Sequence, residues 1–181
     1  MRQTNEKLNV LYIITSANIG GAQVHLHDLI SFLPQQIIPC VAAGEKGWLY
    51  GTLKNKNIDI YHIENLVKPI SVLKDICALL ELYKLVKKIK PDLIHCHSSK
   101  AGFLGRIVGK ICGVPTIFTV HGWAFTEGVT YLKRIFFKTL ERIIAKWTNR
   151  IICVSEYYRQ LGILLMPRLN EKLLTIHKCN S

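Results

Sequence analysis

Residues 10–23 read VLYIITSANIGGAQ, and this stretch contains the pattern on which the fold assignment depends. The run Val10–Ile14 is apolar at every position and rich in β-branched residues, as expected of a strand buried on both faces. Polar residues and the pair Gly20-Gly21 follow, and a helical pattern then runs from Ala22 to Leu33 before Pro34. The stretch therefore predicts a strand, a glycine turn and a helix in direct succession.

The same alternation of short apolar runs and longer helical patterns continues along the chain. Because each return to a parallel neighbour needs a covering helix, the pattern predicts a Rossmann-like α/β fold, with a doubly wound parallel sheet of about seven strands in a single lobe. Further strands are expected at Ile37–Ala43, Ile58–Ile63, Asp92–Cys96, Pro115–Val120, Arg150–Val154 and Leu173–Ile176. Further helices are expected at Trp48–Leu53, Pro69–Lys88, Lys100–Cys112, Tyr131–Trp147 and Tyr157–Leu165.

Length and composition fit one globular domain, and the charge is strongly basic. The 181 residues are 49% hydrophobic and 20% charged, which is typical of a folded protein. The net charge is +12, and the segment Lys68–Arg150 alone holds 15 basic and 5 acidic residues. Such a surface favours an anionic partner, whether lipid headgroups, nucleic acid or a phosphorylated small molecule. No nucleic-acid-binding motif accompanies the charge, and a solvated basic face without a partner is the alternative.

Cysteine usage and hydropathy predict a cytoplasmic protein. The six cysteines are widely spaced without a CxxC pair, which favours reduced thiols in a reducing compartment. The first nine residues are polar, and no stretch approaches the roughly 20 apolar residues that a spanning helix needs. We therefore expect a protein that is soluble or peripheral at the inner face of a membrane.

Ligands of such sheets bind beyond the carboxyl ends of the strands, so the residues at these ends are the candidates for function. Gly20 and Gly21 allow close approach of a ligand, and amides at a helix start favour a phosphate, although a tight turn is the alternative. The sequence there is neither a dinucleotide fingerprint nor a P-loop.

The histidines near the strand ends are candidates for polar contacts rather than for a metal. His95 and His97 share a strand face and could chelate an ion, but no third ligand is recognisable, so no metal is expected. His95 is expected to pack inside its strand, and His97 and Ser98 to lie at the rim. His25 and His27 are two apart on a helix and point in different directions.

Two later strand ends add further candidates. His121 follows the fifth strand, next to Gly122 and Trp123, where it can donate to an oxygen-rich ligand. Ser155 follows the sixth strand and is either an N-cap or a functional residue.

Five segments together resemble the N-terminal domain of family-4 retaining glycosyltransferases, which have a two-lobed B-type fold. They are the glycine pair at Gly20-Gly21, the run Lys90–Ser98, the stretch Gly102–Gly105 with Gly113-Val114-Pro115, Thr119–Gly122 and Ile152–Ser155. Each segment is weakly diagnostic alone, but the five occur in the family's order.

The resemblance implies transfer of a hexose from a nucleotide-sugar donor, without a cofactor or metal, to a lipid-linked or saccharide acceptor in surface polysaccharide or glycolipid synthesis. It places Gly20 and Gly21 near the donor diphosphate and His121, as the catalytic residue, near the transferred sugar. It makes His97, Ser98 and Trp123 candidates for acceptor binding.

The family's second lobe, which binds the nucleotide and carries a pair of glutamates at fixed spacing, is absent from residues 1–181. No two of the eight glutamates have that spacing. The resemblance therefore predicts that the isolated chain has no substantial transferase activity. The alternative is a non-catalytic binding subunit, or a truncated remnant, that needs a partner lobe.

The segment Tyr131–Arg150 has one apolar stripe and one basic face at helical spacing. Packing of the stripe against the sheet is the favoured interpretation. The alternative is docking of this basic amphipathic segment on an anionic membrane surface.

Overall fold

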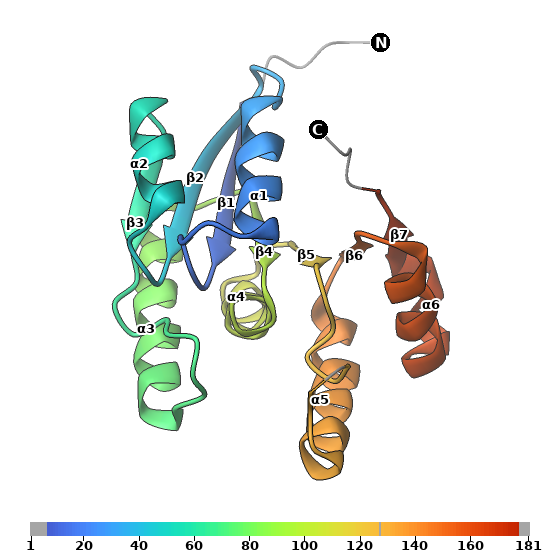
Figure 1. Ribbon diagram of the computed structural model, residues 1–181. Coiled ribbons are helices and arrows are strands. Elements are labelled where there is room, and N and C mark those ends of the chain that lie inside the picture. The colour runs from blue at the N-terminus through green and yellow to red at the C-terminus, as the bar shows by residue number, and fades with distance from the viewer. Residues whose placement is uncertain (1–6, 127, 178–181) are drawn as a thin grey trace.

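A parallel sheet of seven strands organises the chain, in the order β3-β2-β1-β4-β5-β6-β7 (Figure 1). The computed structural model describes residues 7–126 and 128–177. This arrangement confirms the predicted doubly wound sheet, since the chain builds outward from β1 to β3 and then returns to add β4 to β7 on the other side. The strands are β1 (Leu8–Ile14), β2 (Ile37–Ala43), β3 (Asp59–His62), β4 (Leu93–His97), β5 (Thr116–Val120), β6 (Arg150–Cys153) and β7 (Leu173–Thr175).

Helices cover both faces of the sheet, which explains why its strands are apolar without alternation. Along β1, Leu11 and Ile13 belong to the core under α3 and α4, whereas Val10, Tyr12 and Ile14 belong to the core under α1 and α2. The helices are α1 (Gly21–Ser31), α2 (Trp48–Asn55), α3 (Val72–Ile89), α4 (Ser99–Cys112), α5 (Tyr131–Ile144) and α6 (Glu156–Leu165), with short 3-10 helices at Ala145–Trp147 and Pro167–Lys172.

Helix α4 lies unusually close to the sheet because glycines form its inner face. A Cβ atom built on Gly105 would lie 2.5 Å from the Sγ atom of Cys96, and one built on Gly109 would lie 2.2 Å from Cγ2 of Thr116. Side chains at these positions would push α4 away from β4 and β5. Gly102, Gly105 and Gly109 thus set the distance between this helix and the two strands that end at the candidate site.

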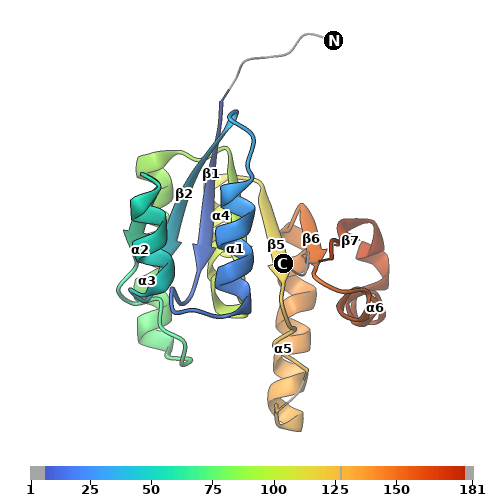
Figure 2. The same ribbon diagram turned by 45° about the horizontal axis from the view of Figure 1, so that its top comes forward.

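Helix α5 departs from the sequence-based expectation. Of its residues only Ile144 is buried, whereas Leu132 is 77% and Phe136 58% exposed. The prediction that its apolar stripe packs against the sheet is therefore wrong for most of the helix. Figures 1 and 2 show the reason: α5 projects beyond the carboxyl ends of the strands, so its first turns have no strand to cover. Helix α3 begins at Val72 rather than at Pro69.

Candidate active site

The carboxyl ends of β1, β4 and β5 bring the predicted residues to one edge. These three strands are neighbours in the sheet. Gly20-Gly21 follows β1, His97 ends β4 and is followed by Ser98, and His121 follows β5. Helix α1, which begins at Gly21, places the ring of His25 at 6.0 Å from that of His97 and 5.2 Å from that of His121, measured between centroids. The expectation that these positions share an edge is confirmed.

Four histidine rings form a cluster at this edge, which we call the histidine cluster: His25, His95, His97 and His121. The rings of His95 and His97 are 4.4 Å apart, and Nδ1 of His97 lies 3.2 Å from Nε2 of His121 in a hydrogen bond. His97 has no exposed surface, so the expectation that it lies at the rim is wrong. It is covered because α1 carries His25 over the end of β4. His95 is buried as expected and bonds Oγ1 of Thr119 at 2.7 Å.

Burial keeps the inner members of the histidine cluster uncharged. It lowers the pKa of His95 to about 3, with a smaller contribution from repulsion by His25. Burial also holds the pKa of His97 well below its usual value, followed by repulsion from His95, His121 and His25. Neutral imidazoles have one donor and one acceptor nitrogen each. The cluster can therefore exchange hydrogen bonds with hydroxyl groups, but His95 and His97 do not supply positive charge near neutral pH.

The ring of His97 contains an unsatisfied nitrogen atom. Nε2 of His97 is buried without a hydrogen-bond partner among residues 7–126 and 128–177. A buried polar atom in this condition calls for an explanation, and functional sites are a common one.

Ser98 holds the ends of β1 and β4 together. Its Oγ atom lies 2.7 Å from Oγ1 of Thr15 and accepts a hydrogen bond from the Thr15 amide at 3.3 Å. Its φ of 72° lies in the left-handed region, which non-glycine residues rarely adopt and which is concentrated at functional sites. Because this hydroxyl is turned towards Thr15, it makes no capping bond to the first turn of α4.

Glu45 is a functional-site residue that the sequence analysis missed. The hydroxyl of Ser16 donates to Oε2 of Glu45 at 2.5 Å, and the amide Nδ2 of Asn18 donates to the same oxygen at 3.0 Å. Glu45 follows β2, and these two hydrogen bonds hold the loop between β1 and α1 in place. No motif marks Glu45, and only the adjacency of β1 and β2 reveals its role. Gly20 is extended at φ 177°, so the backbone itself does not require glycine there.

Trp123 is buried rather than open to the crevice. It is 4% exposed, its indole N–H donates to the carbonyl oxygen of Tyr158 at 2.8 Å, and its ring stacks on Phe125 at 5.3 Å. Its role in acceptor binding stays a prediction. Ser155 is the N-cap of α6, one of the two roles that the sequence left open, because its hydroxyl oxygen accepts a hydrogen bond from the amide of Tyr158.

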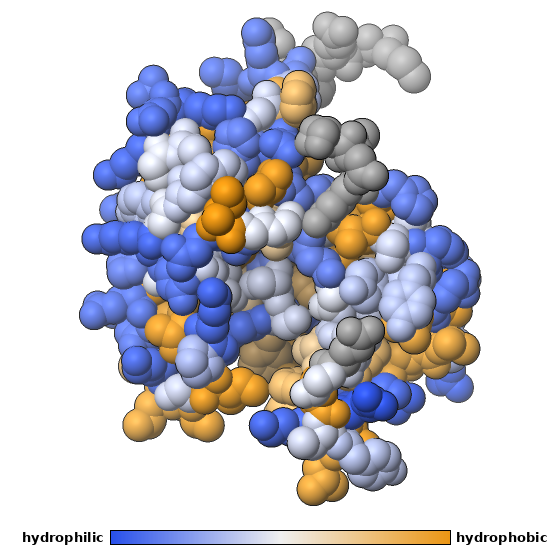
Figure 3. Space-filling model, viewed as in Figure 1, coloured by the Kyte–Doolittle hydropathy of each residue, from blue (hydrophilic) through white to orange (hydrophobic). Residues whose placement is uncertain are grey.

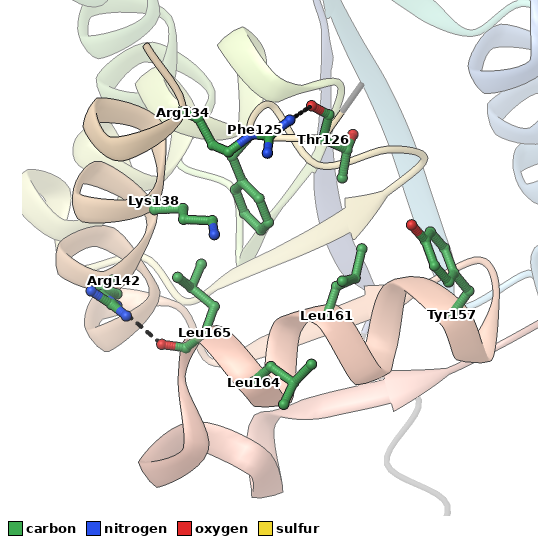
Figure 4. A pocket seen from close by; sticks show the side chains of 9 residues that line it. All are labelled: Phe125, Thr126, Arg134, Lys138, Arg142, Tyr157, Leu161, Leu164 and Leu165. Atoms are coloured by element: carbon green, nitrogen blue, oxygen red, sulfur yellow. Dashed lines mark hydrogen bonds between the residues drawn. The ribbon is translucent and has the colours of Figure 1, made fainter. Parts of the chain in front are cut away.

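Two cavities flank α5. The α5–α6 cavity, of about 360 Å³, has the cationic side chains of Arg134, Lys138 and Arg142 on one side and Leu161 and Leu164 of α6 on the other (Figure 4). The larger α3–α5 groove, of about 540 Å³, lies between α3, α4 and α5 and is mostly apolar. Apolar side chains also gather on the surface at the projecting ends of α3 and α5 (Figure 3).

The described part of the chain contains neither a metal site nor a membrane-spanning helix. No group of three or more His, Cys, Asp or Glu residues there is arranged to hold a metal ion. None of the described helices is long and apolar enough to span a bilayer. The five described cysteines are free thiols.

Comparison with known proteins gives consistent results. The family model for Glycosyltransferase Family 4 matches residues 19–177. An Escherichia coli UDP-Gal:alpha-D-GlcNAc-diphosphoundecaprenol alpha-1,3-galactosyltransferase is 33% identical over 165 residues, covering 90% of this chain and 42% of the relative. The O-antigen biosynthesis glycosyltransferase WbnH of E. coli is 26% identical, covering 93% and 48%.

Solved structures share the fold. Anabaena HepE, in complex with UDP and glucose, superposes with a TM-score of 0.74 at 19% identity, covering 94% of this chain and 44% of that one. MurG of Acinetobacter baumannii superposes with a TM-score of 0.63 at 14% identity, covering 96% and 46%. The chain spans about half the length of the relatives that it matches.

Proposed function

The chain belongs to glycosyltransferase family 4, and we propose that it forms the acceptor-side lobe of a retaining hexosyltransferase. In this proposal a hexose passes from a nucleotide-sugar to an acceptor used in surface polysaccharide or glycolipid synthesis. The relatives named for O-antigen and galactosyl transfer support this assignment. The single observation that carries it is the convergence of Gly20-Gly21, His97 and His121 at one edge of the sheet, within a chain of this family.

His121 is the proposed catalytic residue because it joins the strand end to the histidine cluster. Its Nε2 atom is held by Nδ1 of His97, which fixes the plane of the ring. A fixed imidazole next to a departing glycosyl group can donate to, or accept from, sugar hydroxyls as positive charge develops on the sugar. We assign Ser98 to the acceptor side of the same crevice, and we assign to His97, which has no exposed surface, the role of holding the ring of His121.

The donor diphosphate is assigned to the start of α1. Gly20, the cap residue, has no side chain to accept from the first amides of α1, and Gly21 is the first helical residue. The positive end of the helix dipole favours a leaving diphosphate. The other half of the donor site, including the nucleotide pocket, is assigned to a second lobe, because the relatives are about twice as long as this chain.

The test supplies that second lobe. We would fuse the chain to the C-terminal half of the E. coli galactosyltransferase relative and assay transfer from UDP-galactose. The fusion is expected to transfer, the isolated chain is expected not to, and His121→Ala in the fusion is expected to slow transfer by about 100- to 1,000-fold. Normal turnover by the isolated chain, or an unaffected His121→Ala fusion, would contradict the proposal.

The acceptor is proposed to be lipid-linked and presented at the cytoplasmic face of a membrane. One relative is named for a diphosphoundecaprenol-linked acceptor. On this chain, Arg134, Lys138 and Arg142 project from successive turns of α5 (Figure 4), and none of them forms an ion pair with a described carboxylate. Together with the exposed Leu132 and Phe136, they make α5 a basic amphipathic helix suited to an anionic surface.

Liposome co-sedimentation tests the membrane part separately. Replacing Arg134, Lys138 and Arg142 with Gln is expected to weaken binding to phosphatidylglycerol vesicles by roughly 100-fold, since each cation contributes about 1 kcal/mol near such a surface. The matched control replaces Lys54, Lys56 and Lys110 of other helices and loops in the same way. If both triple variants lose the same amount of vesicle binding, or if binding does not depend on the content of anionic lipid, α5 is excluded as the docking element.

A further inference from the structure

The α3–α5 groove has the lining of a hydrocarbon site. Phe118 and Trp123 are buried at its floor, and Ile76 of α3 and Phe136 of α5 are partly exposed at its margins. Its volume of about 540 Å³ falls within the range of about 300–1,000 Å³ that is usual for ligand pockets.

Four of the five charged side chains that line the groove are paired with one another. The guanidinium of Arg106 forms a bidentate pair with Glu141, at 2.6 and 2.8 Å. The ammonium of Lys100 pairs with Asp75 at 2.6 Å. The groove therefore offers paired charges and apolar surface to a ligand, which fits an uncharged chain better than a phosphate. The charges of the α5–α6 cavity differ from those of the groove, because its cations form no ion pair with a described carboxylate.

The groove lies on the opposite face of the sheet from the histidine cluster, and the two are joined at the strand ends by short stretches of chain. The junction after β4 carries His97 and Ser98 and continues directly into Ser99 and Lys100, which line the groove. The junction after β5 likewise leads from His121 to Trp123 in the groove wall. A molecule whose polar end lies at the histidine cluster could therefore extend over this edge of the sheet into the groove.

The margins of the groove lie at the first turns of α3 and α5, next to the proposed membrane contact of α5. The first turns of α3 and α5 project beyond the strand ends (Figure 1), and apolar surface gathers there (Figure 3). Exposed apolar residues at these ends include Val72, Leu73, Tyr131 and Leu132. Apolar surface of this extent indicates an interaction site in a protein that otherwise carries a polar surface.

We propose that the α3–α5 groove binds the isoprenoid chain of a polyprenyl-diphosphate-linked acceptor, next to its diphosphate. This inference rests on the proposed function and adds a specific place for the lipid. The groove holds the first isoprene units, which orients the acceptor sugar towards His121, and the remaining chain continues into the bilayer between the ends of α3 and α5.

Equilibrium binding of geranylgeranyl diphosphate to the isolated chain tests this directly, followed by tryptophan fluorescence because Trp123 lines the groove. The variant Ile76→Gln/Phe136→Gln makes the margins polar and is expected to weaken binding by about tenfold or more. The control Leu80→Gln/Ile111→Gln changes apolar residues of α3 and α4 that are at least as exposed but do not line the groove. It is expected to bind within about twofold of the parent chain. All four residues are largely exposed, so both variants are expected to fold.

The other outcomes overturn the inference. Equal weakening by the two variants would indicate a general apolar surface rather than a groove. Full displacement by inorganic diphosphate would indicate a site for the headgroup alone. If the parent chain is a dimer that binds no isoprenoid, and if the Ile76→Gln/Phe136→Gln variant is a monomer, the groove is an interface with a second copy of the chain. Because this assay contains neither donor nor second lobe, its failure is distinguishable from failure of the transferase proposal.

Discussion

The buried ion pair between α4 and α5 gives a stability prediction whose sign depends on which partner is removed. The Arg106 guanidinium is 1% exposed, whereas the Glu141 carboxylate is 13% exposed on the projecting helix α5. Besides the pair itself, Nε of Arg106 donates to the carbonyl oxygen of Gly102 at 2.7 Å. We predict that Glu141→Leu destabilises the fold more than Arg106→Met does.

The expected magnitudes follow from what each variant leaves behind. Glu141→Leu leaves a buried guanidinium with only the carbonyl of Gly102, a long contact to Thr148 at 3.4 Å and the face of Phe118 at 4.3 Å. An uncompensated buried charge of this kind costs about 3–5 kcal/mol. Arg106→Met leaves a carboxylate close to the surface that water can reach, so the cost is about 1–3 kcal/mol. Replacing both removes both charges, and the double variant is expected within about 1 kcal/mol of the parent.

Urea unfolding followed by far-UV circular dichroism measures all four proteins of this double-mutant cycle. At an m-value of about 3 kcal/mol/M, Glu141→Leu should lower the unfolding midpoint by roughly 1–2 M. The double variant should recover most of that shift. A double variant as unstable as the sum of the two single changes would refute the reasoning, because it would show that the two side chains contribute independently.

Three further predictions concern packing, pH and capping. Gly109→Ala should destabilise the fold by about 1–3 kcal/mol, because its Cβ would lie 2.2 Å from Thr116. The control Gly51→Ala in α2, which has open space at the Cβ position, should be neutral or stabilising by up to about 1 kcal/mol. Chemical denaturation of both variants measures the difference. The pKa of His95 is lowered to about 3 in the folded state, so between about pH 3 and 6.5 the unfolded chain holds a proton on this ring that the folded chain does not. The free energy of unfolding should therefore fall as the pH drops through that window, by up to about 1.4 kcal/mol per pH unit. His95→Gln should reduce this dependence to the part that His97 contributes, and an unchanged pH slope would exclude His95 as a source. Ser155→Ala should cost about 1 kcal/mol by removing the N-cap of α6, and thermal unfolding that does not shift would show the cap to be dispensable.

The amino-acid pattern alone predicts the sheet and the edge at which the candidate site lies. Seven short apolar runs with helical crossovers permit few arrangements other than a doubly wound parallel sheet. In such a sheet every strand ends at the same edge, so Gly20-Gly21, His97 and His121 had to lie together. The direction of His25 away from His27 also followed from helix geometry, and His27 indeed contacts Asp28 and Trp48 instead of the cluster.

How these residues are covered and held depends on packing between segments that are distant in the chain. His97 is buried because α1 places His25 over it, and Glu45 fixes the β1–α1 loop from a neighbouring strand end. Helix α5 keeps its apolar stripe exposed because it extends past the sheet, although its periodicity is that of a packed helix. Periodicity depends on the local backbone and can be read along the chain. Burial and hydrogen-bond partners depend on segments far apart in sequence, and they are settled only when those segments pack together.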